Sequence, residues 1–372
     1  NASIDLMNNL KQLPLHAFHL GNSAKITSFA GWEMPLSYGS SVKEHMMVRE
    51  NLGFFDVSHM GEIIVKGPQS LQFLNYVLTN NLSDMSNGQA MYTLMCNDDG
   101  GVLDDLIVYR FSSEKFFLCV NAANVDKDYL HLNSIIKSFD CEVLDVSDKY
   151  GLIAIQGPKS TRFLEETLQE KFSEIPRMHF VQKSFFNHFC LVARTGYTGE
   201  DGFEIFLPIE IINEFTNLIS SSFSEKSNAW VGLAARDSLR LEAGFCLHGN
   251  EISENISPVE ARLLWAVSFD KLDFIGKSKL EIQKDNSDYG KVLYYEALHR
   301  RIPRQGDKIY FEESIAGKVL SGGYSPLIKK PIGTAYVQKD YVSYKQKGSW
   351  NADLAGNMIP INFTAPVLKK MI

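Results

Sequence analysis

Two stretches of the chain, GEIIVKGPQSLQFLNYVLT at residues 61–79 and GLIAIQGPKSTRFLEETLQ at residues 151–169, follow one pattern. Aligned without gaps, they have the same residue at eight positions, among them a Gly-Pro pair in the middle. Each copy starts with apolar residues at every second position, the spacing of a half-buried strand. After the Gly-Pro turn, apolar residues recur at three- and four-residue steps, as on one face of a helix. The repeat predicts two related units that each begin with a strand and a helix.

The segments that follow the two copies also correspond. Each copy is followed by two predicted strands and an amphipathic helix, at 104–110, 115–121 and 125–137 in the first and at 188–194, 203–207 and 209–221 in the second. The order β-α-β-β-α is the split-βαβ, ferredoxin-like plan of an α+β protein, and a junction of two such units is a natural crevice for a ligand. Beyond about residue 280, short strands separated by Gly and Pro turns predict a small β-barrel or sandwich, with strands near 291–298, 308–311, 318–321 and 332–337.

Length and composition limit the class of protein. A chain of 372 residues predicts two or three domains, and 45% apolar with 22% charged residues is typical of a globular protein. A net charge of −7 argues against nucleic acid and anionic membrane surfaces as partners. No apolar run is long enough to cross a bilayer, and the first residues lack the layout of a signal peptide or a transit segment. Five scattered cysteines without a C-x-x-C pair favour a reducing compartment.

Several familiar catalytic motifs are missing from the sequence. It contains no G-x-G-x-x-G, P-loop, H-E-x-x-H or Cys/His cluster, so we expect no metal site. Ser58 and His59 are neighbours, but consecutive residues of a strand point to opposite faces, so we do not expect a nucleophile–base pair. Carboxylates, arginines and aromatic residues remain as the groups that could carry the chemistry.

Two acidic positions are candidates. Asp104 and Asp105 precede an apolar strand, so at most one of them can enter a cleft, and position alone favours a solvated start of a hairpin. Glu204 lies within FEIFLP, where a carboxylate is costly unless a donor satisfies it. Two roles fit this position equally well. Glu204 could form an ion pair with an arginine, or it could accept hydrogen bonds from two adjacent donors of a flat ligand.

The segment GLAARDSLRLEAG at 232–244 predicts a helix that ends at Gly244. Arg236 and Arg240 are four residues apart on one face, where Asp237 and Glu242 could pair with them in a purely structural network. GYTGEDG at 196–202 predicts a glycine-rich hairpin loop that carries Tyr197.

Together these segments resemble the glycine cleavage system T-protein (aminomethyltransferase) family, over nearly the whole chain. The residues that carry the resemblance are FAGWEMPLSYG (29–39), FDVSHMGE (55–62), YTLMCNDDGGVLDDLIVYR (92–110), RTGYTGEDGFEI (194–205), GLAARDSLRLEAG (232–244), DFIGK (273–277) and SGGYSPLIKKPIGTAYV (321–337).

The resemblance implies a three-domain cloverleaf with tetrahydrofolate as co-substrate and no metal. Its domains would be a first α+β domain at 1–55 and 140–280, a second at 56–139, and a C-terminal β-barrel or jelly-roll domain at 281–372. It also implies transfer of an aminomethyl group from the dihydrolipoyl arm of H-protein to tetrahydrofolate, giving 5,10-methylenetetrahydrofolate and ammonia. The partners would be lipoylated H-protein, with the P- and L-proteins in the same system, in the bacterial cytoplasm or, for a eukaryotic source, the mitochondrial matrix.

Site residues follow from the positions of the family motifs. Asp105 matches the catalytic carboxylate near the reacting nitrogens of the folate, where we expect it to orient the folate amine and stabilise an iminium-like cation. Glu204 matches the residue that grips the 2-amino group and ring N–H of the pterin. The other positions that match the folate pocket are Met60, Tyr92, Asn121, Tyr197 and Arg236.

The chain departs from the family pattern near its C-terminus. Family members often have I-R-G-K where this chain has LAGN at 354–357, with Ala355 in place of the arginine. Lys370 stands where some relatives have an arginine, and a lysine attracts a carboxylate only as a point charge.

Two alternatives remain, a sister enzyme of the same fold and a protein of another functional class. One is a folate-dependent demethylase with the same pocket and no H-protein. The other is a folate-binding accessory protein of iron–sulfur cluster maintenance, whose K-G-C-Y-type motif is only vaguely matched by GFCLHGNE at 244–251.

Overall fold

The computed structural model describes residues 10–223, 228–286 and 288–371 and divides them into two compact units. Unit 1 contains the described parts of Asn1–Phe73, Asp84–Met91 and Leu106–Arg236. Unit 2 contains those of Leu74–Ser83, Tyr92–Asp105 and Asp237–Ile372. The chain therefore passes between the units several times, and strand β7 (Val102–Ser112) begins in unit 2 and ends in unit 1.

The sequence repeat forms the predicted strand–turn–helix twice. The first copy is β5 (Gly61–Lys66) and α4 (Ser70–Val77), and the second is β10 (Tyr150–Gln156) and α6 (Ser160–Leu168). The shared glycines have matching backbone angles, φ +133° at Gly67 and +134° at Gly157. A Cβ at Gly157 would lie 2.4 Å from the Asn51 carbonyl oxygen. Only glycine combines this φ with such close backbone packing, so the two copies fold alike for the same local reason.

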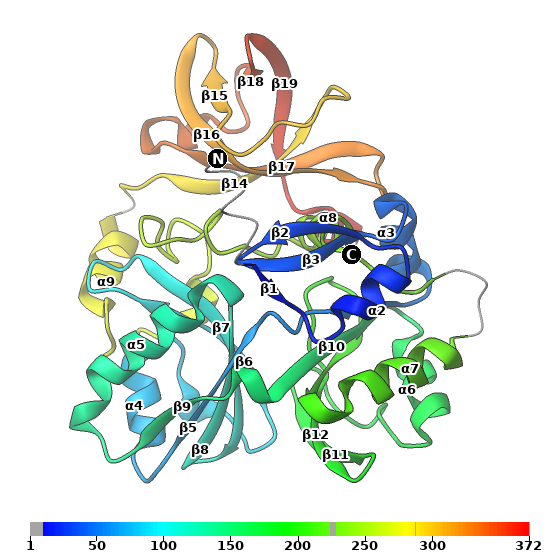
Figure 1. Cartoon of the computed structure of the whole chain (residues 1–372). Coiled ribbons are helices and arrows are strands. Elements are labelled where there is room, and N and C mark those ends of the chain that lie inside the picture. The colour runs from blue at the N-terminus through cyan, green and yellow to red at the C-terminus, as the bar shows by residue number, and fades with distance from the viewer. Residues whose placement is uncertain (1–9, 224–227, 287, 372) are drawn as a thin grey trace, which may run out of the picture. The chain divides into compact units, whose positions relative to one another are not determined.

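Each copy builds a five-stranded sheet with equivalent strand order. The first sheet runs β6-β7-β8-β5-β9 and the second β11-β12-β13-β10-β4 (Figure 1). Their other strands are β6 (Ala90–Cys96), β8 (Lys115–Val120), β9 (Glu142–Asp145), β11 (Phe180–Phe185), β12 (His188–Ala193), β13 (Gly202–Pro208) and β4 (Gly53–Asp56). The predicted helices are α5 (Val125–Ile135) and α7 (Ile212–Ser222).

The edge strands of the two sheets are exchanged between the copies. Strand β4 immediately precedes the first copy but pairs antiparallel with β10, and β9 precedes the second copy but pairs antiparallel with β5. The sequence prediction missed β4, β9 and the outer strands β6 and β11. Strands of this length give a weak periodic signal, and their pairing is decided by partners distant in the chain.

An aromatic layer links side chains from both sheets within unit 1. The ring of Tyr109 on β7 lies edge-to-face with Phe206 on β13, with centroids 5.4 Å apart. Phe117 on β8 contacts Phe206 at 5.0 Å and Tyr150 at 5.6 Å. Tyr109 in this layer interacts with Glu204 and Thr195, two polar residues of unit 1 described below.

A three-stranded sheet in the order β1-β3-β2 completes unit 1, from β1 (Lys11–Gln12), β2 (Lys25–Phe29) and β3 (Trp32–Ser37). Next to it lie helices α2 (His16–Gly21) and α3 (Ser41–Glu50). His19 on α2 bonds the Asp56 carboxylate at 2.7 Å and the Tyr38 hydroxyl at 2.8 Å, which fastens the N-terminal segment to β4.

Unit 2 contains the predicted barrel. Its strands close in the order β14-β17-β16-β15-β18-β19, all pairs antiparallel (Figure 1). They are β14 (Lys291–Ala297), β15 (Lys308–Phe311), β16 (Ser314–Ser325), β17 (Lys330–Val337), β18 (Trp350–Leu354) and β19 (Asn357–Thr364). Helices α9 (Lys277–Asn286) and α10 (Val367–Met371) flank the barrel in the chain, and α8 (Leu233–Ala243) is the predicted helix ended by Gly244.

The fold class predicted from the sequence is confirmed: an α+β protein with two duplicated units and a C-terminal β-barrel. The predicted domain boundaries at 55/56, 139/140 and 280/281 stay a prediction. None of the helices in the described residues is both long enough and apolar enough to span a membrane.

Candidate active site

Asp105 is held at the start of β7 within unit 2. Strand alternation places Asp104 and Asp105 on opposite faces: the first is fully buried and the second half-buried. The hydroxyl of Tyr92 on β6 donates a hydrogen bond of 3.0 Å to Oδ2 of Asp105. The interpretation of this pair as a solvated hairpin start is therefore wrong, because Asp104 has no exposed surface and Asp105 is only partly accessible.

Glu204 lies on β13 in unit 1, among the aromatic residues between the sheets. The Thr195 hydroxyl donates a 2.5 Å hydrogen bond to its Oε2. Burial raises the pKa of the Glu204 carboxyl, while the Thr195 hydrogen bond and the Arg236 guanidinium act to lower it. The hydroxyl satisfies one oxygen and the cation stabilises the charge, so the carboxylate keeps capacity to accept further donors.

Arg236 and Tyr197 form the second part of this arrangement in unit 1. The guanidinium of Arg236 lies over the Tyr197 ring, 4.7 Å from its centroid. Burial lowers the pKa of Arg236, and this is partly offset by Tyr197 and Glu204. The residues present a flat aromatic face, a cation and a carboxylate to one another, which suits a planar heteroaromatic ligand.

Met60 directly precedes β5 and Asn121 directly follows β8. Gly61 and Val120 form the terminal pair of these two antiparallel strands, and their neighbours Met60 and Asn121 are both half-buried. The charge of Arg236 interacts with Cys119, two residues before Asn121. Unit 1 thus gathers the predicted pocket residues Met60, Asn121, Tyr197, Glu204 and Arg236, and unit 2 carries Tyr92 and Asp105.

Ser58 and His59 lie in the turn between β4 and β5, so the prediction that they are strand residues is wrong. The Ser58 hydroxyl accepts a hydrogen bond of 3.0 Å from the Leu152 N–H. Burial and the neighbouring Arg236 lower the pKa of His59 to about 3. The imidazole is therefore neutral at physiological pH, beside the cation.

The two arginines of α8 have different roles. Arg240 is buried and bonds Asp237 at 2.8 Å and Glu251 at 3.0 Å, with a further bond to the Ser321 hydroxyl. The predicted pairing with Asp237 is confirmed for Arg240. Glu242 accepts a hydrogen bond from the Ser325 hydroxyl, and its predicted pairing with an arginine stays a prediction.

Three residues of these arrangements were not predicted. Thr195 is the donor to Glu204, and Trp265 stacks on Tyr92 with ring centroids 5.2 Å apart. Glu62 is buried, and within residues 10–223, 228–286 and 288–371 neither of its carboxylate oxygens has a hydrogen-bond partner. Thr195 and Glu62 lie within the segments that carry the family resemblance. Their spacing in the sequence, however, predicts neither the hydrogen bond from Thr195 to Glu204 nor the burial of Glu62.

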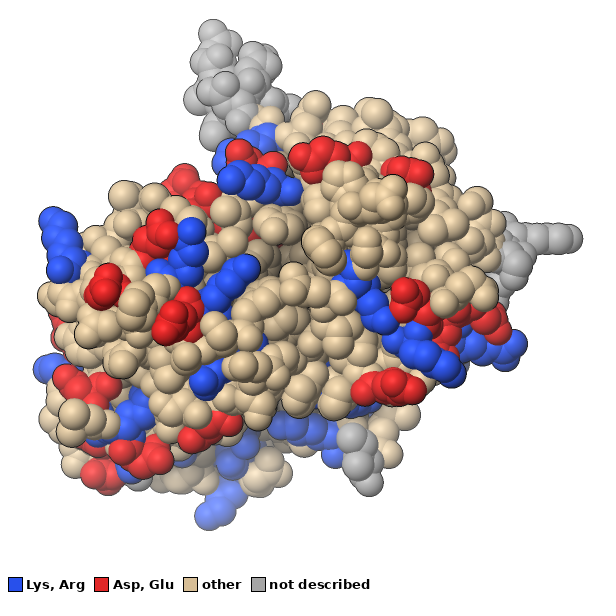
Figure 2. All heavy atoms as spheres, turned by 90° about the horizontal axis from the view of Figure 1, so that it is seen from below, with Lys and Arg blue, Asp and Glu red and all other residues tan. Residues whose placement is uncertain are grey.

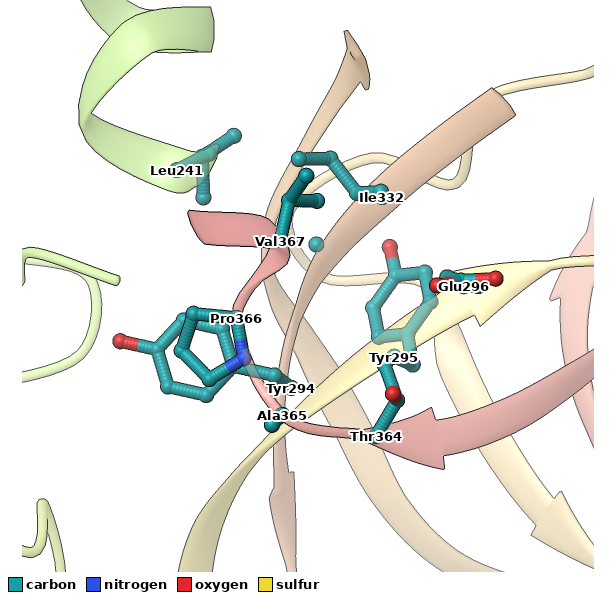
Figure 3. A pocket seen from close by; sticks show the side chains of 10 residues that line it. Leu241, Tyr294, Tyr295, Glu296, Ile332, Thr364, Ala365, Pro366 and Val367 are labelled. Atoms are coloured by element: carbon teal, nitrogen blue, oxygen red, sulfur yellow. The ribbon is translucent and has the colours of Figure 1, made fainter. Parts of the chain in front are cut away.

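Two small hollows in the described residues are partly open to solvent. One in unit 2, of about 210 Å³, is lined by α8, β14, β17 and the segment Thr364 to Val367 (Figure 3). One in unit 1, of about 200 Å³, is lined by Arg236, Asp56 and neighbours. Both are below the roughly 300–1,000 Å³ of typical small-molecule sites. The side chain of Lys370, which stands where some relatives have an arginine, lies outside the part of the chain that the structure describes.

Neither the surface charges nor the arrangement of possible metal ligands points to a further type of ligand. On the face drawn in Figure 2, Lys and Arg side chains alternate with Asp and Glu and do not form one basic field. In the described parts of the chain, no group of three His, Cys, Asp or Glu side chains is placed to hold a metal ion.

Comparison with known proteins gives consistent matches along the chain. The family model described as the GCVT N-terminal domain matches residues 15–271, and that of the glycine cleavage T-protein C-terminal barrel domain matches 293–370. The chain is 44% identical to an aminomethyltransferase of Caldanaerobacter subterraneus subsp. tengcongensis over 91% of this chain and 90% of that protein. It is 41% identical to one of a Thermoanaerobacter species over 98% and 97%. The crystal structure of the glycine cleavage system aminomethyltransferase T from Bartonella henselae matches with a TM-score of 0.89 at 34% identity, covering 96% of this chain and 98% of that one.

Proposed function

Because the chain belongs to the glycine cleavage T-protein family and is an aminomethyltransferase, we propose that its residues act on tetrahydrofolate and on an aminomethyl group carried by the lipoyl arm of H-protein. The chemistry of the residues fits the folate. Glu204 offers carboxylate oxygens to the 2-amino and ring N–H donors of the pterin, a pairing that suits a carboxylate. Around it, Tyr197 would supply an aromatic face, Arg236 a cation, Met60 an apolar contact and Asn121 a polar amide.

The reaction exchanges two bonds at the transferred carbon. Its bonds to the lipoyl sulfur and to nitrogen break, and it forms bonds to the two folate nitrogens. The two protons lost from those nitrogens end on the released thiol and on ammonia, so atoms and charge balance. As ammonia leaves, the carbon becomes an iminium-like cation that needs a negative group near it.

Asp105 supplies that negative group. Its carboxylate is half-buried and is oriented by the Tyr92 hydroxyl at 3.0 Å, so it is fixed before the charge develops. A fixed charge in a partly dehydrated site stabilises a cation more than a solvated one does. The Tyr92–Asp105 hydrogen bond is the observation that carries this assignment.

The experiment compares wild type with Asp105→Asn in the formation of methylenetetrahydrofolate from aminomethylated H-protein and tetrahydrofolate. We expect the turnover number to fall by roughly 10²–10³ with folate affinity retained. Asp98→Asn, an exposed neighbour on the same hairpin, controls for the lost charge and should keep full activity.

Two results would contradict the proposal. Full activity of Asp105→Asn would remove Asp105 from the chemistry. Tight folate binding by wild type without turnover would point to a folate-dependent demethylase or a binding protein instead.

A further inference from the structure

The connection between β12 and β13, residues 194–201, is longer than its counterpart in the first copy of the repeat. The two sheets have equivalent strand orders, so β12 and β13 correspond to β7 and β8. Strands β7 and β8 are joined by residues 113–114 alone. The longer connection, here called the 194–201 loop, carries Thr195 and Tyr197, two residues of the candidate site. The second copy therefore contains a site loop that the first copy lacks.

Gln156, the last residue of β10, contacts this loop through both ends of its side-chain amide. The residue is 1% exposed. Its Nε2 donates to the Thr195 carbonyl at 3.0 Å and to the Phe203 carbonyl at 3.4 Å. Its Oε1 accepts a hydrogen bond of 3.0 Å from the Thr198 hydroxyl. One buried amide thus uses its donors and its acceptor on the loop and on the strand that follows the loop.

Two glycines allow the amide to approach the backbone this closely. A Cβ at Gly196 would lie 1.9 Å from Oε1 of Gln156, and a Cβ at Gly202 would lie 2.6 Å from its Nε2. Both distances are far shorter than a van der Waals contact, so any other residue at these positions would displace the amide. The contact between the loop and Gln156 therefore depends on glycine near both ends of the loop.

The repeat shows that this contact is specific to the second copy. Gln156 aligns with Lys66 of the first copy, which is the last residue of the equivalent strand β5. Lys66 is exposed and forms a surface ion pair with Glu142 at 2.8 Å. The same repeat position therefore carries a solvated cross-strand pair in one copy and a buried amide that holds the site loop in the other.

Two arginines also hold the 194–201 loop. Arg194 donates to both carboxylate oxygens of Asp201, at 2.9 and 2.7 Å, which joins the two ends of the loop. Arg49 on α3 donates to the Thr198 carbonyl at 2.7 Å and to the Glu200 carboxylate at 2.9 Å. These bonds close the loop at its ends and anchor its middle, so the protein itself sets the conformation of the loop.

We propose that Gln156 is a positioning residue for the folate, which holds Thr195 and Tyr197 where the pterin requires them. This inference rests on the proposed function, which assigns the pterin to this group of residues. The Thr195 hydroxyl donates to Glu204, so a shift of the loop would move the donor of the carboxylate that faces the pterin. The centroid of the Tyr197 ring lies 4.7 Å from the Arg236 guanidinium, so the same shift would separate the aromatic face from the cation.

The test measures the tetrahydrofolate affinity of Gln156→Met and its steady-state kinetics with aminomethylated H-protein. Methionine is flexible and unbranched, but it has neither the amide donors nor the amide acceptor. We expect the Kd and the KM for tetrahydrofolate to rise roughly tenfold, because buried polar groups of the loop lose their partner. The KM for H-protein and the turnover number at saturating folate should stay unchanged, because Asp105 and Tyr92 belong to unit 2.

Hydrogen exchange reports on the loop directly. The amides of residues 195–203 should exchange faster in Gln156→Met than in wild type, while those of β5 should keep their wild-type rates. Lys66→Met, which places the same residue at the aligned position of the first copy, is the matched control. It should change neither the exchange of the loop nor the affinity for tetrahydrofolate.

A milder variant tests the same contact if Gln156→Met does not fold. Thr198→Val replaces the hydroxyl that donates to Gln156 by a methyl group, and it should raise the Kd for tetrahydrofolate roughly two- to threefold.

A double-mutant cycle with Tyr197→Ala shows whether Gln156 acts through the loop. If it does, the loss of folate affinity in the double variant is smaller than the product of the two separate losses. Losses that multiply would show that Gln156 acts independently of Tyr197 and would overturn the proposal.

Two further results would overturn it. One is an unchanged Kd for tetrahydrofolate in Gln156→Met although the loop exchanges faster. The other is an equal rise in both KM values with a fall in turnover, which would show a general structural role. If wild type does not bind tetrahydrofolate, the proposed function fails and this inference fails with it. If wild type binds and turns over and Gln156→Met equals it in both, only this inference fails.

Discussion

At the scale of single residues, the two carboxyl groups of Glu204 and Glu62 in unit 1 differ in their hydrogen-bond partners and neighbouring charges. Glu204 has a hydroxyl donor and a nearby cation. Glu62 is more deeply buried than Glu204, and among the residues that the structure describes no donor reaches its oxygens. Burial and the neighbouring Asp145 raise the pKa of Glu62 well above the usual range. The Glu62 carboxyl therefore binds its proton more tightly in the folded protein than in the unfolded chain.

This difference predicts a pH dependence of stability. A raised folded-state pKa gives a stabilising contribution that is complete below the unfolded pKa, near 4.3, and is lost as pH rises towards the folded pKa. The free energy of unfolding should fall from pH 5 to pH 8, and Glu62→Gln, which cannot ionise, should fall less. Urea titrations at several pH values measure this. Glu214→Gln on α7, an exposed site, is the control, and equal slopes for Glu62→Gln and wild type would contradict the prediction.

At the scale of elements, a buried network of charged and polar side chains connects α8 to the segment after it and to the barrel. Arg240 on α8 is 1% exposed and bonds Glu251, which has no exposed surface and also accepts from the Leu247 N–H and the Thr334 hydroxyl on β17. The network joins the helix, the segment after it and the barrel strand. A buried pair of this kind is sensitive to loss of one partner, because the other charge is left uncompensated.

We therefore expect Arg240→Met to lower the free energy of unfolding of the part containing the barrel by roughly 3–5 kcal/mol. The double variant Arg240→Met with Glu251→Gln should recover part of that loss, because it removes the orphaned charge. Thermal unfolding followed by circular dichroism measures both. Equal loss in the single and double variants would show that packing, and not charge, dominates the cost.

At the scale of the whole molecule, recognition of a protein carrier depends on surface charge. Arg300 and Arg301 lie exposed in the connection between β14 and β15. If they steer an acidic H-protein, the double charge reversal Arg300→Glu, Arg301→Glu should raise the apparent KM for H-protein several-fold at low salt, and less at high salt because salt screens exposed charges. Kinetics across a salt series measure this. Lys345→Glu with Lys347→Glu, another exposed pair on the barrel, is the control, and unchanged kinetics would remove the arginines from the docking surface.

The repeat, its Gly-Pro turns and the change of pattern after residue 280 by themselves determined the α+β class, the duplication and the barrel. These features depend on local periodicity and on backbone angles that only certain residues adopt, as Gly67 and Gly157 show. The family motifs also determined which side chains to consider at the site. Both kinds of information are contained in short stretches of chain, so they can be read without the fold.

Only the tertiary structure decided the exchange of β4 and β9, the burial of Asp104, the Thr195 donor to Glu204 and the stacking of Trp265 on Tyr92. In each case the partner is distant in the sequence, and no periodicity encodes which distant residue a side chain will meet. Strand pairing and burial depend on many contacts between distant parts of the chain. The sequence of one segment contains only a few of these contacts, so it cannot predict them. The physical reason is that desolvation and cross-strand packing exist only once the chain has brought these segments together.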